Sequence, residues 1–213
     1  MTQNTADSLR VLLKQARQTM SVADRQRASL LLRARLYTWL ATHQTQQRQA
    51  AAALPQIVAG FWPLADEPDL LELYRQWHEQ GLTVVLPVMQ SDHSLHFHPW
   101  TPQMPMQARQ FGVMEPAEGE DTLPDILLVP LLGFTIDGHR IGYGKGFYDR
   151  TLARLRMQGL HPTAIGVAWD CANINAIASN YQPAAHDQAL DAVITPETWY
   201  PHEPAFGAIP RLS

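Results

Sequence analysis

The chain has little of what marks several classes of protein. Its 213 residues include one cysteine, Cys171, which excludes an internal disulfide and a cysteine-rich zinc site. Charged residues make up only 17%, below the usual level of about 25%. The formal net charge is −4, so the strongly basic balance typical of duplex-binding proteins is missing. We therefore expect no nucleic-acid partner.

Long hydrophobic runs are also missing. A transmembrane helix needs about 20 apolar residues, whereas the longest apolar stretch, residues 126–134, is far shorter and contains a proline and a glycine. The first seven residues are polar, and Arg10, Lys14 and Arg17 interrupt the apolar pattern that follows, which is unlike a secretory signal. We expect a cytoplasmic protein that has no membrane partner.

The composition that remains is that of a globular protein. Hydrophobic residues make up 46% of the chain, near the usual level of about 45–50%. A chain of this length buries roughly 70% of its unfolded surface, which is enough for a core without disulfides. The length predicts a single domain over residues 1–213. The sequence leaves the oligomeric state open, and we expect a monomer or a weak homodimer.

Local patterns predict two helices followed by alternating strands and helices. Apolar residues at helical spacing over 9–16 form a first amphipathic stripe, and a capping box at Ser21 begins a second helix that continues to Leu40. The polar stretch 44–49 is predicted to be a connection. An acidic pair followed by proline, Asp66-Glu67-Pro68, is predicted to open the next helix.

Short apolar runs bounded by turn residues predict the strands. They lie at residues 56–62, 83–88, 125–130, 163–168 and 192–195, with a helix at 147–157 and a half-exposed strand at 95–99. The proline-rich remainder of 89–122 reads as an irregular excursion. Strands that alternate with helices indicate an α/β fold, a three-layer sandwich with a mainly parallel central sheet.

The segment 137–150 stands out chemically. Its three alternating glycines lie between a strand and a helix, where backbone N–H groups and the helix N-terminus can surround a phosphate. Arg140, Lys145 and Arg150 add cations, and Asp149 offers an oxygen ligand for Mg²⁺. The pattern is neither a Walker A loop nor a dinucleotide fingerprint. The alternative is a glycine-rich turn with solvated cations.

The run Arg140-Ile-Gly-Tyr-Gly-Lys-Gly-Phe-Tyr-Asp-Arg150 resembles the signature R-L-G-x-G-x-G-Y-Y-D of the 5-formyltetrahydrofolate cyclo-ligase family, also called methenyltetrahydrofolate synthetases. Weaker similarities to the family occur on both sides of this signature, at residues 111–116, 165–168 and 191–195, in the order that the family has. The resemblance implies a fold like that of sugar-phosphate isomerases and CoA-transferases. It also implies ATP- and Mg²⁺-dependent cyclisation of 5-formyltetrahydrofolate to 5,10-methenyltetrahydrofolate, with release of ADP and phosphate, through a phosphorylated formyl intermediate.

The same resemblance implies a role for each of a set of residues. ATP would be bound by Arg10, Lys14, Arg140, Ile141, Gly142, Tyr143, Gly144, Lys145, Gly146, Phe147 and Tyr148. Folate would be bound by Trp62, Glu67, Tyr143, Gly144, Lys145, Gly146 and Phe147. Lys145 and Arg140 would be catalytic by neutralising phosphate charge, and Asp149 and Asp191 would hold Mg²⁺. The family usually has a lysine where this chain has Ala6.

Structural roles are open for several of these residues. Glu67 could be a helix-start carboxylate, Asp191 a strand-edge residue and Trp62 part of the core. His96 and His98 share a strand face but have no third ligand for a metal, and His186-Asp187 is predicted to be a solvated loop.

Two other functions compete with the ligase. One is a folate- or nucleotide-binding homologue without turnover, which would not need a metal ligand. The other is a sugar-phosphate isomerase or CoA-transferase-like enzyme with Glu67 or Glu115 as its carboxylate, a reading that rests on fold analogy alone.

Overall fold

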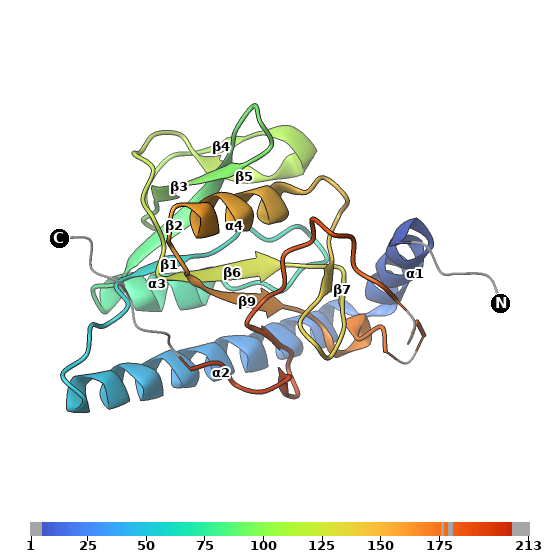
Figure 1. The fold of residues 1–213 in the computed structure, drawn as a ribbon, viewed down its shortest axis with the longest axis horizontal. Coiled ribbons are helices and arrows are strands. Elements are labelled where there is room, and N and C mark those ends of the chain that lie inside the picture. Colours follow the sequence, from blue (N-terminus) through green and yellow to red (C-terminus); the bar gives the residue numbers. More distant parts are fainter. Residues whose placement is uncertain (1–5, 176, 179–180, 206–213) are drawn as a thin grey trace.

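A seven-stranded sheet forms the centre of the molecule in the computed structural model, which describes residues 6–175, 177–178 and 181–205 (Figure 1). Five neighbouring strands are parallel: β10 (Ala192–Ile194), β9 (Thr163–Val167), β6 (Ile126–Pro130), β1 (Ile57–Ala59) and β2 (Thr83–Met89). Antiparallel strands border them, β11 (Trp199–Tyr200) beside β10 and β3 (Leu95–Pro99) beside β2. The mainly parallel sheet predicted from the sequence is confirmed.

Helices cover both faces of this sheet, as the three-layer prediction requires (Figure 1). The helices are α1 (Ala6–Thr19), α2 (Val22–Gln49), α3 (Leu71–Glu79) and α4 (Phe147–Met157). One face packs against α2 and α3, and the other packs against α4. At the start of α2, the Ser21 hydroxyl accepts a hydrogen bond from the Asp24 N–H at 3.1 Å, as the capping-box pattern predicts. No helix within the described residues is long and apolar enough to span a bilayer.

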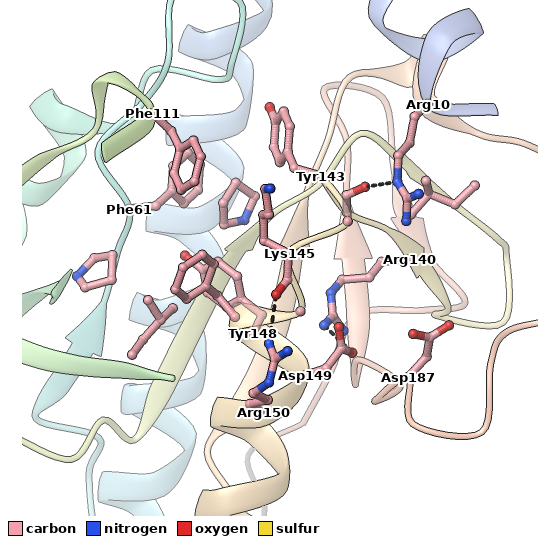
Figure 2. Close-up of a pocket in the computed structure, with 18 of the residues that line it drawn as sticks. Arg10, Phe61, Phe111, Arg140, Tyr143, Lys145, Tyr148, Asp149, Arg150 and Asp187 are labelled. Atoms are coloured by element: carbon pink, nitrogen blue, oxygen red, sulfur yellow. Dashed lines mark hydrogen bonds and ion pairs between the residues drawn. The ribbon is translucent and has the colours of Figure 1, made fainter. Parts of the chain in front are cut away.

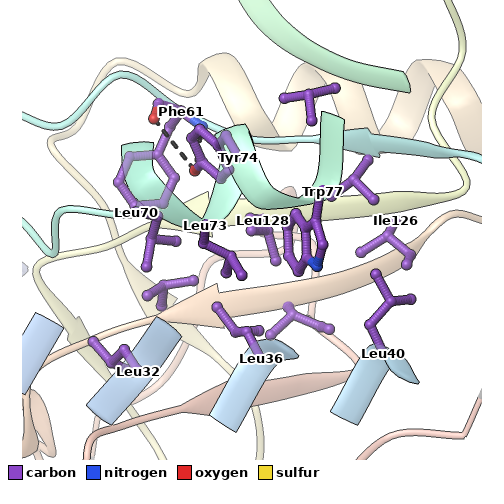
Figure 3. Packing of buried hydrophobic residues seen from close by; sticks show 14 of the residues in the cluster. Leu32, Leu36, Leu40, Phe61, Leu70, Leu73, Tyr74, Trp77, Ile126 and Leu128 are labelled. Carbon is purple, nitrogen blue, oxygen red and sulfur yellow. Dashed lines mark hydrogen bonds between the residues drawn. The ribbon is translucent and has the colours of Figure 1, made fainter. Parts of the chain in front are cut away.

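The core follows from the alternation of side chains along each strand. Ile126 and Leu128 point to the face covered by α2 and α3, where they join Leu36 and Trp77 (Figure 3). Their neighbours Leu127 and Val129 point to the opposite face, toward α4. Because both faces are buried, the parallel strands read as continuous apolar runs rather than as alternating ones.

Two element predictions are wrong. Residues 44–49 are the last turns of α2 and not a connection, because glutamine and arginine sustain an exposed helix as well as apolar residues do. The Asp66-Glu67-Pro68 triplet does not open a helix, since α3 begins at Leu71. Asp69 accepts a hydrogen bond from the N–H of Leu71 at 2.9 Å instead, and Glu67 remains in a turn before the helix.

The proline-rich stretch between β2 and β6 is more regular than predicted. After β3 it forms a hairpin of β4 (Met106–Ala108) and β5 (Met114–Pro116), connected through the short 3₁₀ turn η1 (Gln110–Gly112). The Glu115 carboxylate of β5 accepts a hydrogen bond from the Met89 N–H at the end of β2, at 3.1 Å. This bond holds the hairpin beside the carboxyl end of the parallel sheet.

The strand order creates a crevice between β1 and β6. From β1 the chain passes through α3 to β2 on one side, and from β6 it passes through α4 to β9 on the other. The connections leave in opposite directions, so the carboxyl ends of β1 and β6 are not covered by either of them, which is where open α/β sheets usually bind ligands.

Candidate active site

A cavity of about 1160 Å³ opens at this crevice. The segment after β1, the ends of β2 and β6, the glycine-rich loop and the first turns of α1 and α4 line it. Figure 2 shows Lys145 near its centre, with Phe61 and Phe111 on one side and with Arg10, Arg140, Asp149 and Asp187 on the other. The pocket therefore has an apolar aromatic side and a charged side.

The glycine-rich loop joins the hairpin of β7 (Gly133–Phe134) and β8 (Arg140–Ile141) to α4. Gly144 and Gly146 have φ angles of 86° and 70°, left-handed values that side chains rarely adopt. Gly146 is the residue that precedes α4, so the free N–H groups of the first turn of α4 face the pocket. The Arg10 guanidinium donates to the Gly142 carbonyl at 2.9 Å and thereby attaches α1 to the loop.

Cations and aromatic rings meet in the middle of the pocket. The exposed Lys145 ammonium group lies 5.5 Å from the centre of the Phe111 ring, and that of Lys14 lies 5.8 Å from the Tyr143 ring. Phe111 is 58% exposed and has a φ of 63°, which is uncommon for a residue with a side chain. The hairpin thus presents an exposed aromatic ring to the cation of the glycine-rich loop.

The charged side holds two carboxylates. Asp149 accepts hydrogen bonds from the Arg140 guanidinium at 2.5 Å and from the Gln188 N–H at 2.9 Å. Arg140 also donates to the Gln188 carbonyl at 2.6 Å, and its side chain is only 5% exposed. Asp187 lines the same side and accepts from the Ala184 N–H at 2.8 Å. Arg140 therefore fixes Asp149 and the loop that carries Asp187.

Asp191 does not lie in the pocket. It precedes β10, at the amino edge of the sheet, and accepts a hydrogen bond from the Ala164 N–H at 2.7 Å. Asp125, just before β6, does the same for the N–H groups of Gln56 and Ile57. Asp191 is thus a strand-edge carboxylate that stabilises the neighbouring strand, and the metal role predicted for it is not supported by its position.

Glu67 is a buried carboxylate at the pocket wall, with 6% of the residue exposed. It accepts hydrogen bonds from the Leu64 N–H at 2.9 Å and from the Tyr143 hydroxyl. Burial raises the pKa of Glu67, and these two hydrogen bonds oppose the rise. Burial and the nearby charge of Glu67 likewise raise the pKa of Tyr143.

The model of the 5-formyltetrahydrofolate cyclo-ligase family matches residues 2–196. The chain belongs to this family. A 5-formyltetrahydrofolate cyclo-ligase from Haemophilus influenzae is 32% identical over 158 residues, which cover 68% of this chain and 83% of that protein. The Mycolicibacterium smegmatis cyclo-ligase is 28% identical over 207 residues, which cover 92% of this chain and 96% of the Mycolicibacterium protein.

Solved structures of methenyltetrahydrofolate synthetases have the same fold. The Mycoplasma pneumoniae protein superposes with a TM-score of 0.67 at 22% identity, over 90% of this chain and 98% of its own. The Aquifex aeolicus protein gives the same TM-score at 21% identity, over 98% and 96%. At this identity the likeness concerns the fold alone.

The structure brings most residues predicted from the cyclo-ligase resemblance to one pocket. It is lined by Arg10, Lys14, Trp62, Glu67, Arg140, Ile141, Gly142, Tyr143, Gly144, Lys145, Gly146, Phe147, Tyr148 and Asp149. Trp62 is half-buried and also packs against the core, so both readings of this residue fit its position. Ala6, which replaces the lysine usual in the family, lines the pocket as well.

Sequence reasoning missed the residues that reach the pocket from distant segments. They include Phe61, Phe111, Tyr181 and Asp187. The available signals were the family-like run at residues 111–116 and the adjacent pair His186-Asp187. The pair lies in a solvent-exposed turn, as predicted, and this turn borders the pocket, with 3.7 Å between the His186 Nε2 and an Asp187 oxygen. His96 contacts Asp121 at 3.5 Å, and no group of three or more metal-binding side chains occurs in the described parts of the chain.

Proposed function

We propose that this chain catalyses the ATP-dependent cyclisation of 5-formyltetrahydrofolate to 5,10-methenyltetrahydrofolate, with ADP and phosphate as the other products. The observation that carries the proposal is one pocket with two chemistries. Its charged side combines a glycine-rich loop, a helix N-terminus, Lys145 and carboxylates, and its other side combines aromatic rings with the buried Glu67. A nucleoside triphosphate needs the charged side and a pterin ring needs the aromatic side, and the reaction requires the two next to each other.

The reaction proceeds by activation of an amide oxygen. The formyl oxygen of the folate attacks the γ-phosphorus of ATP, an O–P bond forms, and the bond from the γ-phosphorus to the β–γ bridging oxygen breaks to release ADP. The neighbouring folate amine then attacks the formyl carbon and loses its proton, and the C–O bond breaks to release phosphate. Phosphate leaves far more easily than hydroxide, so the protein has to supply alignment and charge neutralisation.

Phosphate binding is assigned to the charged side. Backbone N–H groups of the loop around Gly144 and of the first turn of α4 can donate to phosphate oxygens. Lys145 is exposed in the pocket and free to follow the transferring phosphoryl group, whereas Arg140 is held against Asp149. We therefore assign transition-state charge neutralisation to Lys145, with Arg10 and Lys14 at the nucleotide, and give Arg140 the role of fixing Asp149.

Folate binding is assigned to the aromatic side. A pterin has ring N–H groups that match an ionised carboxylate, and Glu67 is a carboxylate at the wall of this part of the pocket. Trp62 and Phe111 provide ring faces for stacking. Phe111 adds this contact from the β4–β5 hairpin, near the Lys145 ammonium group.

The donor set of the charged side fits Mg²⁺. This ion typically takes one or two carboxylates together with substrate phosphates, and Asp149 and Asp187 are the two carboxylates of that side. We propose that these two hold the metal, Asp187 in place of the predicted Asp191. When bound with ATP, Mg²⁺ would neutralise part of the phosphate charge.

A direct assay tests the proposal. Protein, 5-formyltetrahydrofolate, ATP and Mg²⁺ are mixed, and the near-ultraviolet absorbance of the methenyl product is followed. A rise that requires all four components supports the ligase. If calorimetry detects binding of both ligands but no product forms at any protein concentration, the chain is the non-catalytic binding homologue. A cytoplasmic location and a monomeric or weakly dimeric state stay predictions.

A further inference from the structure

Arg17 is a charged residue with no exposed surface and does not line the pocket. With Arg10 and Lys14 it interrupts the apolar pattern of α1, but the helix turns Arg17 into the protein, where it contacts Tyr143 of the glycine-rich loop. One guanidinium nitrogen donates to the Tyr143 hydroxyl at 3.0 Å and another donates to the Leu131 carbonyl. Burial of a guanidinium group costs free energy unless the group is paired, so the burial of Arg17 suggests a role for the hydrogen bonds that it makes.

The Tyr143 hydroxyl joins Arg17 to Glu67. It accepts from Arg17 and donates to Oε1 of Glu67, while Oε2 of Glu67 accepts from the Leu64 N–H. A guanidinium group can only donate, and a tyrosine hydroxyl has one proton to give. The bond from Arg17 therefore leaves the Tyr143 proton directed at Glu67, which fixes one carboxylate oxygen and the plane of the group.

Other charged and titratable groups around Glu67 oppose its ionisation. Asp66, in the same turn, raises the pKa of Glu67, as burial does, whereas the positive charge of Arg17 lowers it. Tyr74 of α3 and Tyr148 of α4 also face this region, and burial together with the charge of Glu67 raises the pKa of both hydroxyls. These tyrosines stay protonated at neutral pH and supply no compensating charge. Arg17 is thus the group that favours the carboxylate form electrostatically.

We propose that Arg17 is a positioning residue for folate binding, which acts through the Tyr143 hydroxyl to hold the Glu67 carboxylate in one orientation at the pterin side of the pocket. The inference rests on the proposed function for the identity of the ligand. The Arg17–Tyr143–Glu67 network itself rests on the geometry alone.

The network has a pH signature with a definite sign. Removal of the positive charge raises the pKa of Glu67 further, so a larger fraction of Glu67 is protonated in weakly acidic solution. A protonated carboxyl group accepts pterin N–H groups poorly. The acidic limb of kcat/KM for folate therefore shifts to higher pH when Arg17 is replaced, while the basic limb is not affected.

The experiment compares Arg17→Met, Arg17→Lys and Tyr143→Phe with Arg25→Met as a matched control. Arg25 is a partly buried arginine of α2 that donates to the Met20 carbonyl and does not line the pocket. For Arg17→Met we expect KM for 5-formyltetrahydrofolate to rise about tenfold and KM for ATP to stay within about twofold. We expect the acidic limb of kcat/KM for folate to move to higher pH, because loss of the Arg17 charge raises the pKa of Glu67. Arg17→Lys keeps the charge, so its rise in KM for folate and its shift of the acidic limb should both be smaller than those of Arg17→Met. Arg25→Met should show neither change.

A double variant tests whether the two residues act as one unit. Because Tyr143→Phe interrupts the same chain of hydrogen bonds, Arg17→Met combined with Tyr143→Phe should be no worse than the more impaired single variant. Additive losses would overturn the relay. Equal rises in KM for both substrates in a folded Arg17→Met protein would also overturn it, since they indicate general damage to the pocket.

A measurement without ligand separates this inference from the proposed function. Carboxyl carbons of glutamate are titrated by NMR, and the Glu67 signal is identified by its loss in Glu67→Gln. The Glu67 midpoint should rise in Arg17→Met and in Tyr143→Phe, and an unchanged midpoint would overturn the inference. If wild type forms no methenyl product, the ligase proposal fails while this titration still decides the role of Arg17. If Arg17→Met does not fold, Tyr143→Phe gives the same decision, because it removes the hydrogen bond that Glu67 accepts from Tyr143.

Discussion

Lys145 differs from Arg140 and Arg150, the other cations of the glycine-rich loop, in the interactions of its side chain. Arg140 is bound to Asp149, and Arg150 donates to the Lys145 carbonyl at 2.7 Å. Within the described residues, the Lys145 ammonium group faces the exposed ring of Phe111, at 5.5 Å. A compact charge on a flexible stem can follow a phosphoryl group as it moves from donor to acceptor.

Replacement of Lys145 by alanine should therefore remove turnover and leave the fold intact. We expect kcat to fall by about 10²- to 10³-fold, since loss of one transition-state donor has effects of that size. The melting temperature should stay close to that of wild type because the side chain is exposed. Full activity in a folded Lys145→Ala protein would remove the phosphate role from this residue.

A second residue-scale prediction separates Asp187 from Asp191. Asp187→Asn removes a carboxylate from the charged side of the pocket and should raise the Mg²⁺ concentration needed for half-maximal activity by about tenfold. Asp191→Asn weakens the hydrogen bond to Ala164 and should lower the free energy of unfolding by about 1 kcal/mol. Its Mg²⁺ dependence should be that of wild type. The reverse pattern in a Mg²⁺ titration would restore Asp191 as the metal ligand.

At the scale of elements, α4 has a left-handed glycine at each end. Gly146 precedes its first residue with a φ of 70°, and Gly159 follows its C-terminal cap with a φ of 76°. A Cβ at Gly159 would meet no atom within 4 Å, whereas one at Gly146 would lie 2.8 Å from an Arg150 nitrogen and beside the pocket. The two positions therefore share a backbone conformation but differ in their surroundings.

Alanine at each of these positions gives a matched pair. Both Gly146→Ala and Gly159→Ala should lower the free energy of unfolding by about 1–2 kcal/mol, the usual penalty for a side chain in the left-handed region. Only Gly146→Ala should also lower kcat/KM, because it changes the phosphate-binding loop. Denaturant unfolding and the methenyl assay measure the two effects, and similar kinetic losses in both variants would show that loop geometry is not the cause.

Elements with a local signal were predictable from the sequence. The bounds of α4 agree with the prediction because its apolar spacing, its preceding glycine and its following glycine all lie between Gly146 and Gly159. The end of α2 was not predicted, because an exposed polar helix has no apolar stripe. Glu67 was misplaced on a helix, since an acidic residue before proline also occurs in turns.

The candidate site also has a part that local sequence signals predict and a part that they do not. Loop residues 140–150 are contiguous and carry a recognisable pattern, so most of the phosphate side was predictable from the sequence. Arg17 is paired with a tyrosine 126 positions away, and Asp187 reaches the pocket from a loop after β9. Neither arrangement leaves a periodicity or a spacing in the chain, so only the tertiary structure reveals them.

At the scale of the whole molecule, the net charge of −4 conceals a local group of cations on one side of the pocket. Arg10, Lys14, Lys145 and Arg150 all line it, against the carboxylates of the charged side. On the charged side these four cations and Arg140 face only Asp149 and Asp187 among the carboxylates that line the pocket. Such a local excess of one sign of charge concentrates field lines and attracts a polyanion during its approach.

The association of ATP should therefore depend on ionic strength. Raising salt from about 0.01 M to about 0.15 M shortens the Debye length from about 30 Å to about 8 Å, so kcat/KM for ATP should fall several-fold. Lys14→Ala should flatten this dependence, whereas Arg33→Ala, at a residue outside the pocket, should not. A salt-independent kcat/KM for ATP would show that the local cations do not steer the nucleotide.

The two ends of the parallel strands have different roles in the central sheet, the amino ends a structural one and the carboxyl ends a functional one. Asp125 and Asp191 complete the hydrogen bonding at the amino edge, and the pocket occupies the carboxyl edge between β1 and β6. A saturation mutational scan that scores cellular abundance and growth separately should therefore split in space. Variants that lower abundance would include the amino edge, and variants that keep abundance but lose growth would gather at the carboxyl edge. Clinical or environmental variants of such an enzyme could then be sorted by position into those that a stabilising ligand can rescue and those that it cannot.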